Sequence, residues 1–169
     1  MSPVAELPTR RLALRPPRLA EAPALFAFLG DAAAMRHTHA DASLRECRRR
    51  IAAHERRRRL DGVAPWTIRL REEGRIIGWG GLYQDPFEPG WGIELGYFFA
   101  PAAWGQGYAS ELALACTHLA DTALGLPLLT AFAHPENAGS RRVLEKAGFV
   151  AERFLPEMQR ILYRRPRPG

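Results

Sequence analysis

The sequence predicts a mixed α/β fold in which helices cover a central sheet. Three stretches indicate it. Apolar residues between positions 19 and 29 recur at the helical period, and from 66 to 83 the pattern changes to that of strands. An apolar stretch from 93 to 99 then precedes two glycines, Gly105 and Gly107, and a further helical pattern. Strands and helices interleaved in this order are expected to pack as layers around one sheet.

The first third of the chain is expected to form one strand and two helices. Residues 9–15 alternate between polar and apolar and end before a Pro-Pro pair, which is typical of a strand. The helix that follows is closed by Gly30. A second helix begins where Ser43 and Glu46 form an S-x-x-E capping box, and it ends at Gly62.

Three antiparallel strands should follow. Residues 66–70 and 75–83 flank a Glu-Glu-Gly turn, as in a hairpin. Three glycines in the second strand indicate either a bulge or a ligand pressed close to the backbone; they are Gly78, Gly80 and Gly81. The third strand covers 93–99 and is stopped by Pro101.

The remaining elements alternate between helix and strand. We expect a helix from 111 to about 123, a short strand over 128–133 and a helix over 140–147. One or two last strands should cover 149–153 and 158–163.

Length and composition indicate one ordinary globular domain over residues 1–169, with a short Arg/Pro tail at 164–169. The 169 residues suffice for a core, and 47% of them are hydrophobic. No apolar run reaches the length of a membrane span, so no membrane partner is expected. The first six residues do not resemble a signal region, which predicts a cytoplasmic protein.

The charge pattern does not predict a specific nucleic-acid partner. The formal net charge is +6, but all basic residues except Lys146 are arginine, and no nucleic-acid-binding motif accompanies them. A preference for arginine over lysine, together with abundant Ala and Pro, is more typical of a bias in genomic base composition than of a nucleic-acid-binding surface. The two cysteines, Cys47 and Cys116, have no partner at metal-ligand spacing and are expected to be buried thiols, so no metal is predicted.

A strand, a glycine-rich turn and a helix N-terminus together predict an anion site after residue 99. Glycines allow consecutive N–H groups to point at one phosphate, and the helix dipole adds to the attraction. The turn is not a Walker loop, because no Gly-Lys-Ser/Thr follows it. It also fits a Rossmann turn poorly, because Ser110 stands where the third glycine belongs.

Two motifs resemble those of the GCN5-related N-acetyltransferases. The stretch from Glu94 to Glu111, with Trp-Gly-Gln-Gly-Tyr-Ala in its loop, is similar to their motif A, and 137–149 is similar to their motif B. Within the family, the residues of these two motifs are most similar to those of the RimJ/RimL-like branch. The resemblance implies a twisted, mostly antiparallel sheet of six to seven strands flanked by about four helices.

The resemblance also implies acetyl-CoA as the donor. Backbone N–H groups of the loop would hold the pyrophosphate, the strand backbone before it would pair with pantetheine amides, and an Asn would bond the cofactor arm. The implied cofactor-binding residues are Phe98, Phe99, Trp104, Gly105, Gln106, Gly107, Tyr108, Ala109, Asn137 and Ser140.

Two catalytic residues are expected, Glu94 and Ser140. Glu94 interrupts an apolar strand and would act as the base for the amine, directly or through water; the alternative is a salt bridge. Many family members use a Tyr to protonate the leaving thiolate, but Leu144 occupies that position here. Ser140, one turn earlier, would take that role, or would serve only as the N-cap or a first-turn residue of the helix. Glu111 more simply favours its helix N-terminus.

Five residues are weaker candidates for the acceptor cleft: His37, His39, Trp66, Tyr83 and Tyr97. Loop histidines are often only solvated, and the aromatic Trp79 is more typical of a core.

The leading hypothesis is an N-acetyltransferase that moves the acetyl group directly to a primary amine in a ternary complex. An α-amine has a lower pKa than a lysine amine and loses its proton more readily at neutral pH, which favours a protein or peptide N-terminus as the acceptor. The alternatives are a small amine such as an antibiotic, polyamine or amino acid, and a non-catalytic acyl-CoA-binding domain. Either a monomer or a homodimer is compatible with the sequence.

Overall fold

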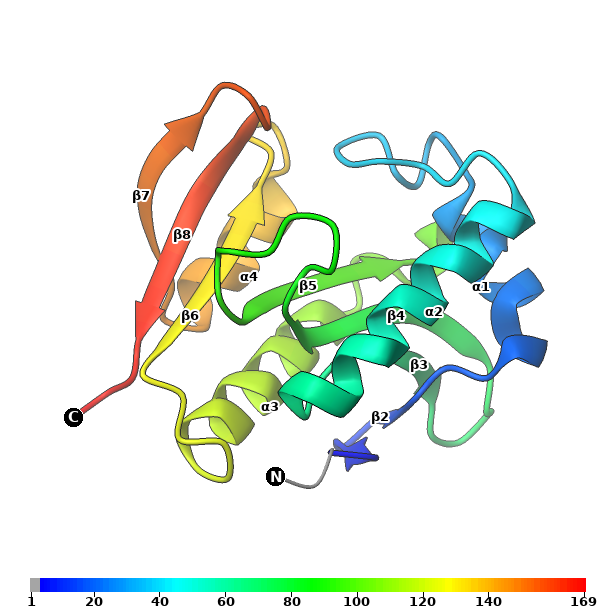
Figure 1. The fold of residues 1–169 in the computed structure, drawn as a ribbon, viewed down its shortest axis with the longest axis horizontal. Coiled ribbons are helices and arrows are strands. Elements are labelled where there is room, and N and C mark those ends of the chain that lie inside the picture. Colours follow the sequence, from blue (N-terminus) through cyan, green and yellow to red (C-terminus); the bar gives the residue numbers. More distant parts are fainter. Residues whose placement is uncertain (1–3) are drawn as a thin grey trace.

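The structure, a computed structural model, describes residues 4–169. The expectation that the first six residues are not a signal region therefore lies partly outside the described residues. One eight-stranded sheet has the order β1-β2-β3-β4-β5-β6-β8-β7 (Figure 1). Its strands are β1 (Leu7–Pro8), β2 (Leu12–Arg15), β3 (Trp66–Leu70), β4 (Ile76–Tyr83), β5 (Glu94–Phe99), β6 (Leu128–Ala133), β7 (Val150–Leu155) and β8 (Arg160–Pro166). The mixed α/β class with a mostly antiparallel sheet is confirmed.

Helices lie on both faces of the sheet (Figure 1). They are α1 (Ala22–Leu29), α2 (Leu44–Asp61), α3 (Tyr108–Asp121) and α4 (Ala138–Lys146), with 3-10 turns η1 (Leu19–Glu21) and η2 (Pro101–Ala103). One core cluster joins α1 and α2 to β4 through Trp79, and the other joins α3 and α4 to the opposite face. Trp79 is thus a core residue, as its strand position predicts.

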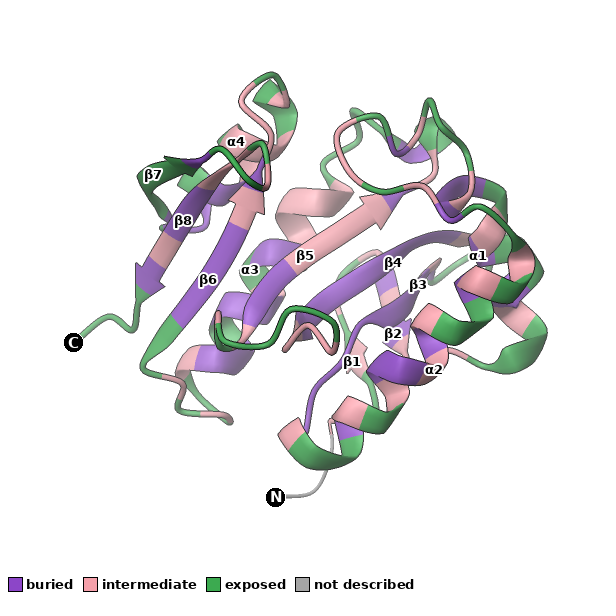
Figure 2. Ribbon diagram, turned by 45° about the horizontal axis from the view of Figure 1, so that its top comes forward, coloured by how far each residue is buried: buried purple, intermediate pink, exposed green. Residues whose placement is uncertain are grey.

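Among residues 4–169, β5 and β6 are the only parallel neighbours, and they diverge after one residue pair. One residue pair, Glu94 with Thr130, links them, whereas β4 and β5 pair along six residues. Beyond that pair the two strands diverge, which leaves the β6 side of β5 without a ladder partner. Figure 2 shows β5 and β6 diverging between the two halves of the sheet.

Local sequence explains where α2 and α3 begin. Ser43 Oγ accepts from the Glu46 N–H at 3.1 Å, and the Glu46 carboxylate accepts from the Ala42 N–H at 2.7 Å, so the capping interactions form. α3 begins at Tyr108, three residues before the expected start, because Gly107 adopts the left-handed φ of 81° and turns the chain into the helix.

The glycines of β4 serve close packing. A Cβ at Gly80 would lie 2.5 Å from the Gly96 carbonyl on β5, and one at Gly81 would lie 2.4 Å from the Trp66 ring. The irregular pairing falls between Ile68 and Arg69 on β3. The expected bulge is therefore present near these glycines. The other expectation, a ligand close to the backbone, does not apply at Gly80 and Gly81, because protein atoms fill the space there.

Several boundaries differ from expectation. The sheet has eight strands where six or seven were expected, because two-residue β1 adds to one edge. The tail is shorter than 164–169, because residues through Pro166 pair in β8. Both cysteines are buried free thiols, as expected. In the part of the chain that the structure describes, no helix is long and apolar enough to cross a membrane.

Candidate active site

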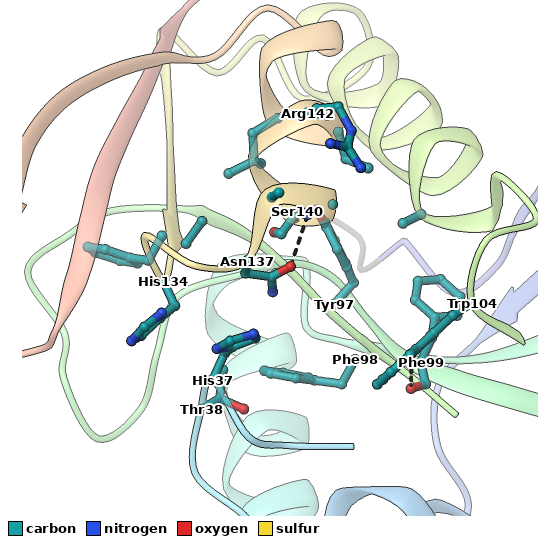
Figure 3. A pocket seen from close by; sticks show the side chains of 18 of the residues that line it. His37, Thr38, Tyr97, Phe98, Phe99, Trp104, His134, Asn137, Ser140 and Arg142 are labelled. Atoms are coloured by element: carbon teal, nitrogen blue, oxygen red, sulfur yellow. Dashed lines mark hydrogen bonds between the residues drawn. The ribbon is translucent and has the colours of Figure 1, made fainter. Parts of the chain in front are cut away.

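The opening between β5 and β6 contains a cavity of about 680 Å³, within the usual range for small-molecule sites. The whole of β5, the end of β6 and the first turns of α3 and α4 line it, together with residues of the loop at 34–38. Figure 3 shows Tyr97, Asn137 and Ser140 around its centre. Both motifs singled out in the sequence therefore meet at one cavity.

The glycine-rich loop presents a helix N-terminus to this cavity. Gly105 and Gly107 have φ of 74° and 81°, the left-handed region that favours glycine. Within residues 4–169, no side chain caps the first turn of α3, and Gly107 through Ser110 line the cavity. The leading N–H groups of a 14-residue helix are thus left for an anion.

Arg11, in the turn between β1 and β2, contacts this loop and the first turn of α3. Its Nε lies 2.7 Å from Glu111 Oε2, one of its terminal nitrogens donates to the Gln106 carbonyl at 2.9 Å, and its guanidinium stacks over the Tyr108 ring. Glu111 also accepts from the Thr9 hydroxyl at 2.7 Å. Sequence reasoning missed Arg11, because nothing near it in the sequence indicates a partner 100 residues away.

These contacts define the state of Glu111. Burial acts to raise the pKa of Glu111, but hydrogen bonds from Thr9 and Arg11 outweigh it and lower the pKa overall. Glu111 is therefore ionised and links the first turn of α3 to the turn between β1 and β2, in addition to favouring the helix N-terminus.

Ser140 on α4 contacts Tyr97 on β5 at the wall of the cavity. The two hydroxyl oxygens lie 3.0 Å apart, and either can be the donor. Burial raises the pKa of Tyr97 to about 12, with the Ser140 bond acting in the opposite direction. Asn137 is the N-cap of α4, because its Oδ1 accepts from the Ser140 N–H at 3.1 Å. The Ser140 hydroxyl does not cap the helix, which leaves it available for chemistry.

Glu94 is a buried carboxyl on the first residue of β5. Burial, followed by the nearby charge of Asp85, raises its pKa to about 8. The alternative reading as a salt bridge fails, since Glu94 forms no ion pair within 4.0 Å among residues 4–169. Its side chain lines the cavity beside Tyr83, whose pKa is also raised by burial. A carboxyl with a pKa near neutrality in a cavity is suited to proton transfer.

The remaining donor-side residues occupy different places. The Trp104 indole donates to the Phe99 carbonyl at 2.9 Å, so that carbonyl is already engaged. Phe98 stacks on Trp79 at 6.1 Å, although it also lines the cavity. Gln106 is absent from the lining, and its carbonyl accepts from Arg11.

Comparison with known proteins decides the family. The family model described as "Acetyltransferase (GNAT) domain" matches residues 11–150, which is most of the chain. The chain belongs to the GNAT acetyltransferase family. The recognition made from motifs A and B is confirmed.

Relatives and solved structures agree with this assignment. YkkB of Bacillus subtilis, described as uncharacterized, is 32% identical over 104 residues; the match covers 62% of this chain and 60% of YkkB. The acetyltransferase from Agrobacterium tumefaciens has a TM-score of 0.81 at 27% identity, covering 97% of this chain and 95% of that one.

The RimJ/RimL-like resemblance also has a structural counterpart. RimL, titled a ribosomal L7/L12 alpha-N-protein acetyltransferase in complex with coenzyme A, has a TM-score of 0.79 at 17% identity. The alignment covers 96% of this chain and 98% of RimL, and at that identity it shows a shared fold.

The five expected acceptor residues of this GNAT domain divide into two groups. His37, Tyr83 and Tyr97 line the cavity, and the His37 ring stacks on His134 with centroids 4.8 Å apart (Figure 3). Two others lie elsewhere. Trp66 is fully buried in the core on the α3 side. His39 is absent from the cavity lining, and its Nε2 lies 2.7 Å from Glu46. The expectation that Trp66 and His39 line the cleft is therefore wrong.

Two groups of this GNAT domain bring metal-ligand atoms within 4.8 Å of one another: His37, His134 and Glu136, and His39, Asp41 and Glu46. In the first, His134 Nδ1 already accepts from the Glu136 N–H at 3.1 Å. In the second, His39 already contacts Glu46. We keep the expectation that no metal takes part in the reaction.

Removal of metal tests that expectation. Dialysis against a chelator should leave kcat and the thermal unfolding midpoint of the GNAT domain unchanged, because the named cavity residues need no cation for proton transfer. A loss of activity that Zn²⁺ restores would contradict it.

Proposed function

We propose that residues 1–169 form a single N-acetyltransferase domain that moves the acetyl group of acetyl-CoA directly to a primary amine. One observation carries the proposal: a single cavity joins an uncapped helix N-terminus to a buried carboxyl whose pKa is raised to about 8. The first is suited to a pyrophosphate and the second to an amine's proton. Membership in an acetyltransferase family supports the combination.

The donor side fits coenzyme A by its backbone chemistry. The N–H groups from Gly105 to Ala109 would hold the pyrophosphate at the start of α3. The unpaired edge of β5 beyond Glu94 would accept the pantetheine amides as an added strand. The register with β4 turns the backbone groups of Phe98 toward Trp79, contrary to the expectation that Phe98 pairs with pantetheine. Because Trp104 occupies the Phe99 carbonyl, the backbone groups of Tyr97 and the Phe99 N–H are the ones left on the open edge. The free amide nitrogen of Asn137 can bond the cofactor arm.

Glu94 and the Ser140–Tyr97 pair divide the proton transfers. Glu94 accepts a proton from the acceptor amine, directly or through water, so that the neutral amine can attack the thioester carbonyl. The amine forms the new C–N bond, the C–S bond breaks, the attacking nitrogen releases its second proton to water, and the leaving thiolate takes up one proton. The Ser140 hydroxyl donates a hydrogen bond to that sulfur, and Tyr97 can replace the proton through the 3.0 Å contact.

The acceptor class we favour is the N-terminal α-amine of a protein or peptide. A base with a pKa near 8 matches an α-amine, whose pKa is also near 8, better than a lysine amine near 10.4. The fold shared with RimL, whose title names an alpha-N-protein acetyltransferase, agrees with this choice.

Two measurements test the proposal. CoA should raise the thermal unfolding midpoint, because a ligand bound only by the folded state stabilises it. Thiol release from acetyl-CoA should then depend on an added amine across panels of peptides and small amines. Preference for small amines would replace the favoured acceptor class by the alternative. CoA binding without thiol release on any amine would leave a non-catalytic acyl-CoA-binding domain.

Arg11→Gln should weaken CoA binding by about tenfold, because the variant loses the ion pair to Glu111 and loosens the loop that holds the pyrophosphate. Calorimetric titration with CoA measures this. Arg10→Gln is the matched control, since Arg10 is an exposed neighbour. Equal affinities of the two variants would show that these Arg11 contacts do not support the loop.

A further inference from the structure

Arg160 is a cavity-lining cation on the first residue of β8. The next residue, Ile161, pairs with Ala133 at the end of β6, so Arg160 stands at the mouth of the opening between β5 and β6. It thus lies at the far end of β6 from the Glu94–Thr130 pair.

The strand registers place Arg160 on the same sheet face as Glu94. Thr130 pairs with Glu94 on one side and with Arg164 on the other, and paired residues share a face. Side chains alternate along a strand, so Arg164 and Arg160, four residues apart, point the same way. The base and this cation therefore face one chamber.

The two arginines on that face differ in their partners. Arg164 contacts Glu152 at 3.3 Å and Thr130 Oγ1 at 3.1 Å, and it lies over the Trp91 ring. For Arg160, neither a side-chain hydrogen bond nor an ion pair is found with any residue from 4 to 169. A guanidinium carries five donors in a planar fork that fits a carboxylate. Arg160 has those donors free toward the cavity, and its charge lies near enough to Glu94 to favour the ionised carboxylate.

We propose that Arg160 binds a carboxylate of the acceptor, so that the acceptor is a primary amine with a carboxylate a few bonds away. The inference rests on the proposed function and narrows its substrate class. Two sources share this chemistry: a free amino acid, and a peptide whose first residue is acidic. Glu94 would take the proton of the amine while Arg160 fixes the carboxylate, which orients the amine toward the thioester.

Two matched pairs of acceptors test the inference. Methionine and methioninamide represent the free amino acid, and C-terminally amidated tripeptides that begin with Asp or Asn represent the peptide. Arg160→Gln should lower kcat/KM about 10- to 100-fold on the carboxylate member of the preferred pair, mainly through KM. On the amide member the loss should be clearly smaller, because it reflects only the missing positive charge near the Glu94 base, which affects every amine. The amide also changes the basicity of the amine, so the deciding quantity is the effect of the variant on each acceptor.

Arg164→Gln is the matched control, because it removes an equal charge from the same face outside the cavity lining. Arg160→Lys should fall between wild type and Arg160→Gln, since it keeps the charge and loses the fork. An equal loss on carboxylate and amide acceptors, or no loss on either, would overturn the assignment.

A binding experiment separates this inference from the proposed function. Calorimetric titration of CoA-loaded protein with the same four acceptors needs no turnover. Carboxylate-selective binding that Arg160→Gln abolishes supports the role of Arg160 even where no acetyl transfer occurs, in which case only the proposed function fails. If wild type shows no preference for the carboxylate members, the inference is wrong, whatever the activity on other amines.

Discussion

Glu94→Gln should lower kcat by about 100- to 10,000-fold while leaving CoA affinity within about twofold. Gln is nearly isosteric with Glu but cannot accept the amine's proton at neutral pH. Glu94 lines the cavity away from the α3 N-terminus that would hold the pyrophosphate, so donor binding should persist. Steady-state kinetics on the best acceptor, together with CoA titration, measure both quantities. Full activity in this variant would refute the assignment of Glu94 as the base.

The pH profile gives the same assignment a second test. Because the pKa of Glu94 is raised to about 8, the carboxyl is protonated and inactive as a base below that value. Activity of the wild type should therefore rise as pH increases toward 8 and level off above it. The residual activity of Glu94→Gln should not show this rise between neutral pH and pH 8.

Glu94→Gln should also raise the free energy of unfolding. The folded-state pKa of about 8 exceeds the ordinary value of 4.5, so the folded protein binds more protons than the unfolded chain between these pH values. Wild-type stability thus falls as pH rises from 4.5 to 8, and Gln removes that loss. At pH 8 the gain should be on the order of 2–4 kcal/mol, measured by denaturant unfolding. A gain that does not grow across this window would contradict the raised pKa.

Ser140→Ala should lower kcat by about 10- to 100-fold, the loss expected for one hydrogen bond to a developing thiolate. Tyr97→Phe should have a similar effect, because it removes the other hydroxyl of the 3.0 Å pair. Both variants should keep the CoA affinity and the unfolding midpoint of the wild type within a few degrees.

The double variant decides whether the two hydroxyls act together. If they form one proton path, Ser140→Ala with Tyr97→Phe should be little worse than either single change, since coupled residues are not additive. Losses that multiply would mean that the two hydroxyls act independently and do not form one proton path. Unchanged kcat in all three variants would remove the pair from the mechanism.

Local patterns in the sequence were sufficient for most of the fold. The capping box at Ser43 and the alternation before Arg15 each report on near neighbours, and both placed their elements to within a few residues. The errors fall where long-range pairing decides. Arg164 to Pro166 read as a tail because their composition is polar, yet pairing with β6 makes them strand.

The candidate site shows the same division. The glycines at 105 and 107 and the acidic residue at 94 were found from sequence, because each breaks a local pattern. Arg11 and the contact between Tyr97 and Ser140 were missed, since both depend on residues at least 43 positions apart. Trp66 was misplaced because strand position alone does not say which sheet face a side chain occupies.

The tie from Glu111 to Thr9 and Arg11 has a consequence for how this protein is made. These partners are 102 and 100 residues apart, so during synthesis the N-terminal strand emerges long before the helix that it must meet. Chain closure over that distance comes at the end of folding rather than at its start. Affinity for CoA should therefore be a property of the finished chain alone. Hydrogen exchange at the Arg11 amide, which donates to Glu111 at 2.6 Å, should slow when CoA is added and should report completion of the fold.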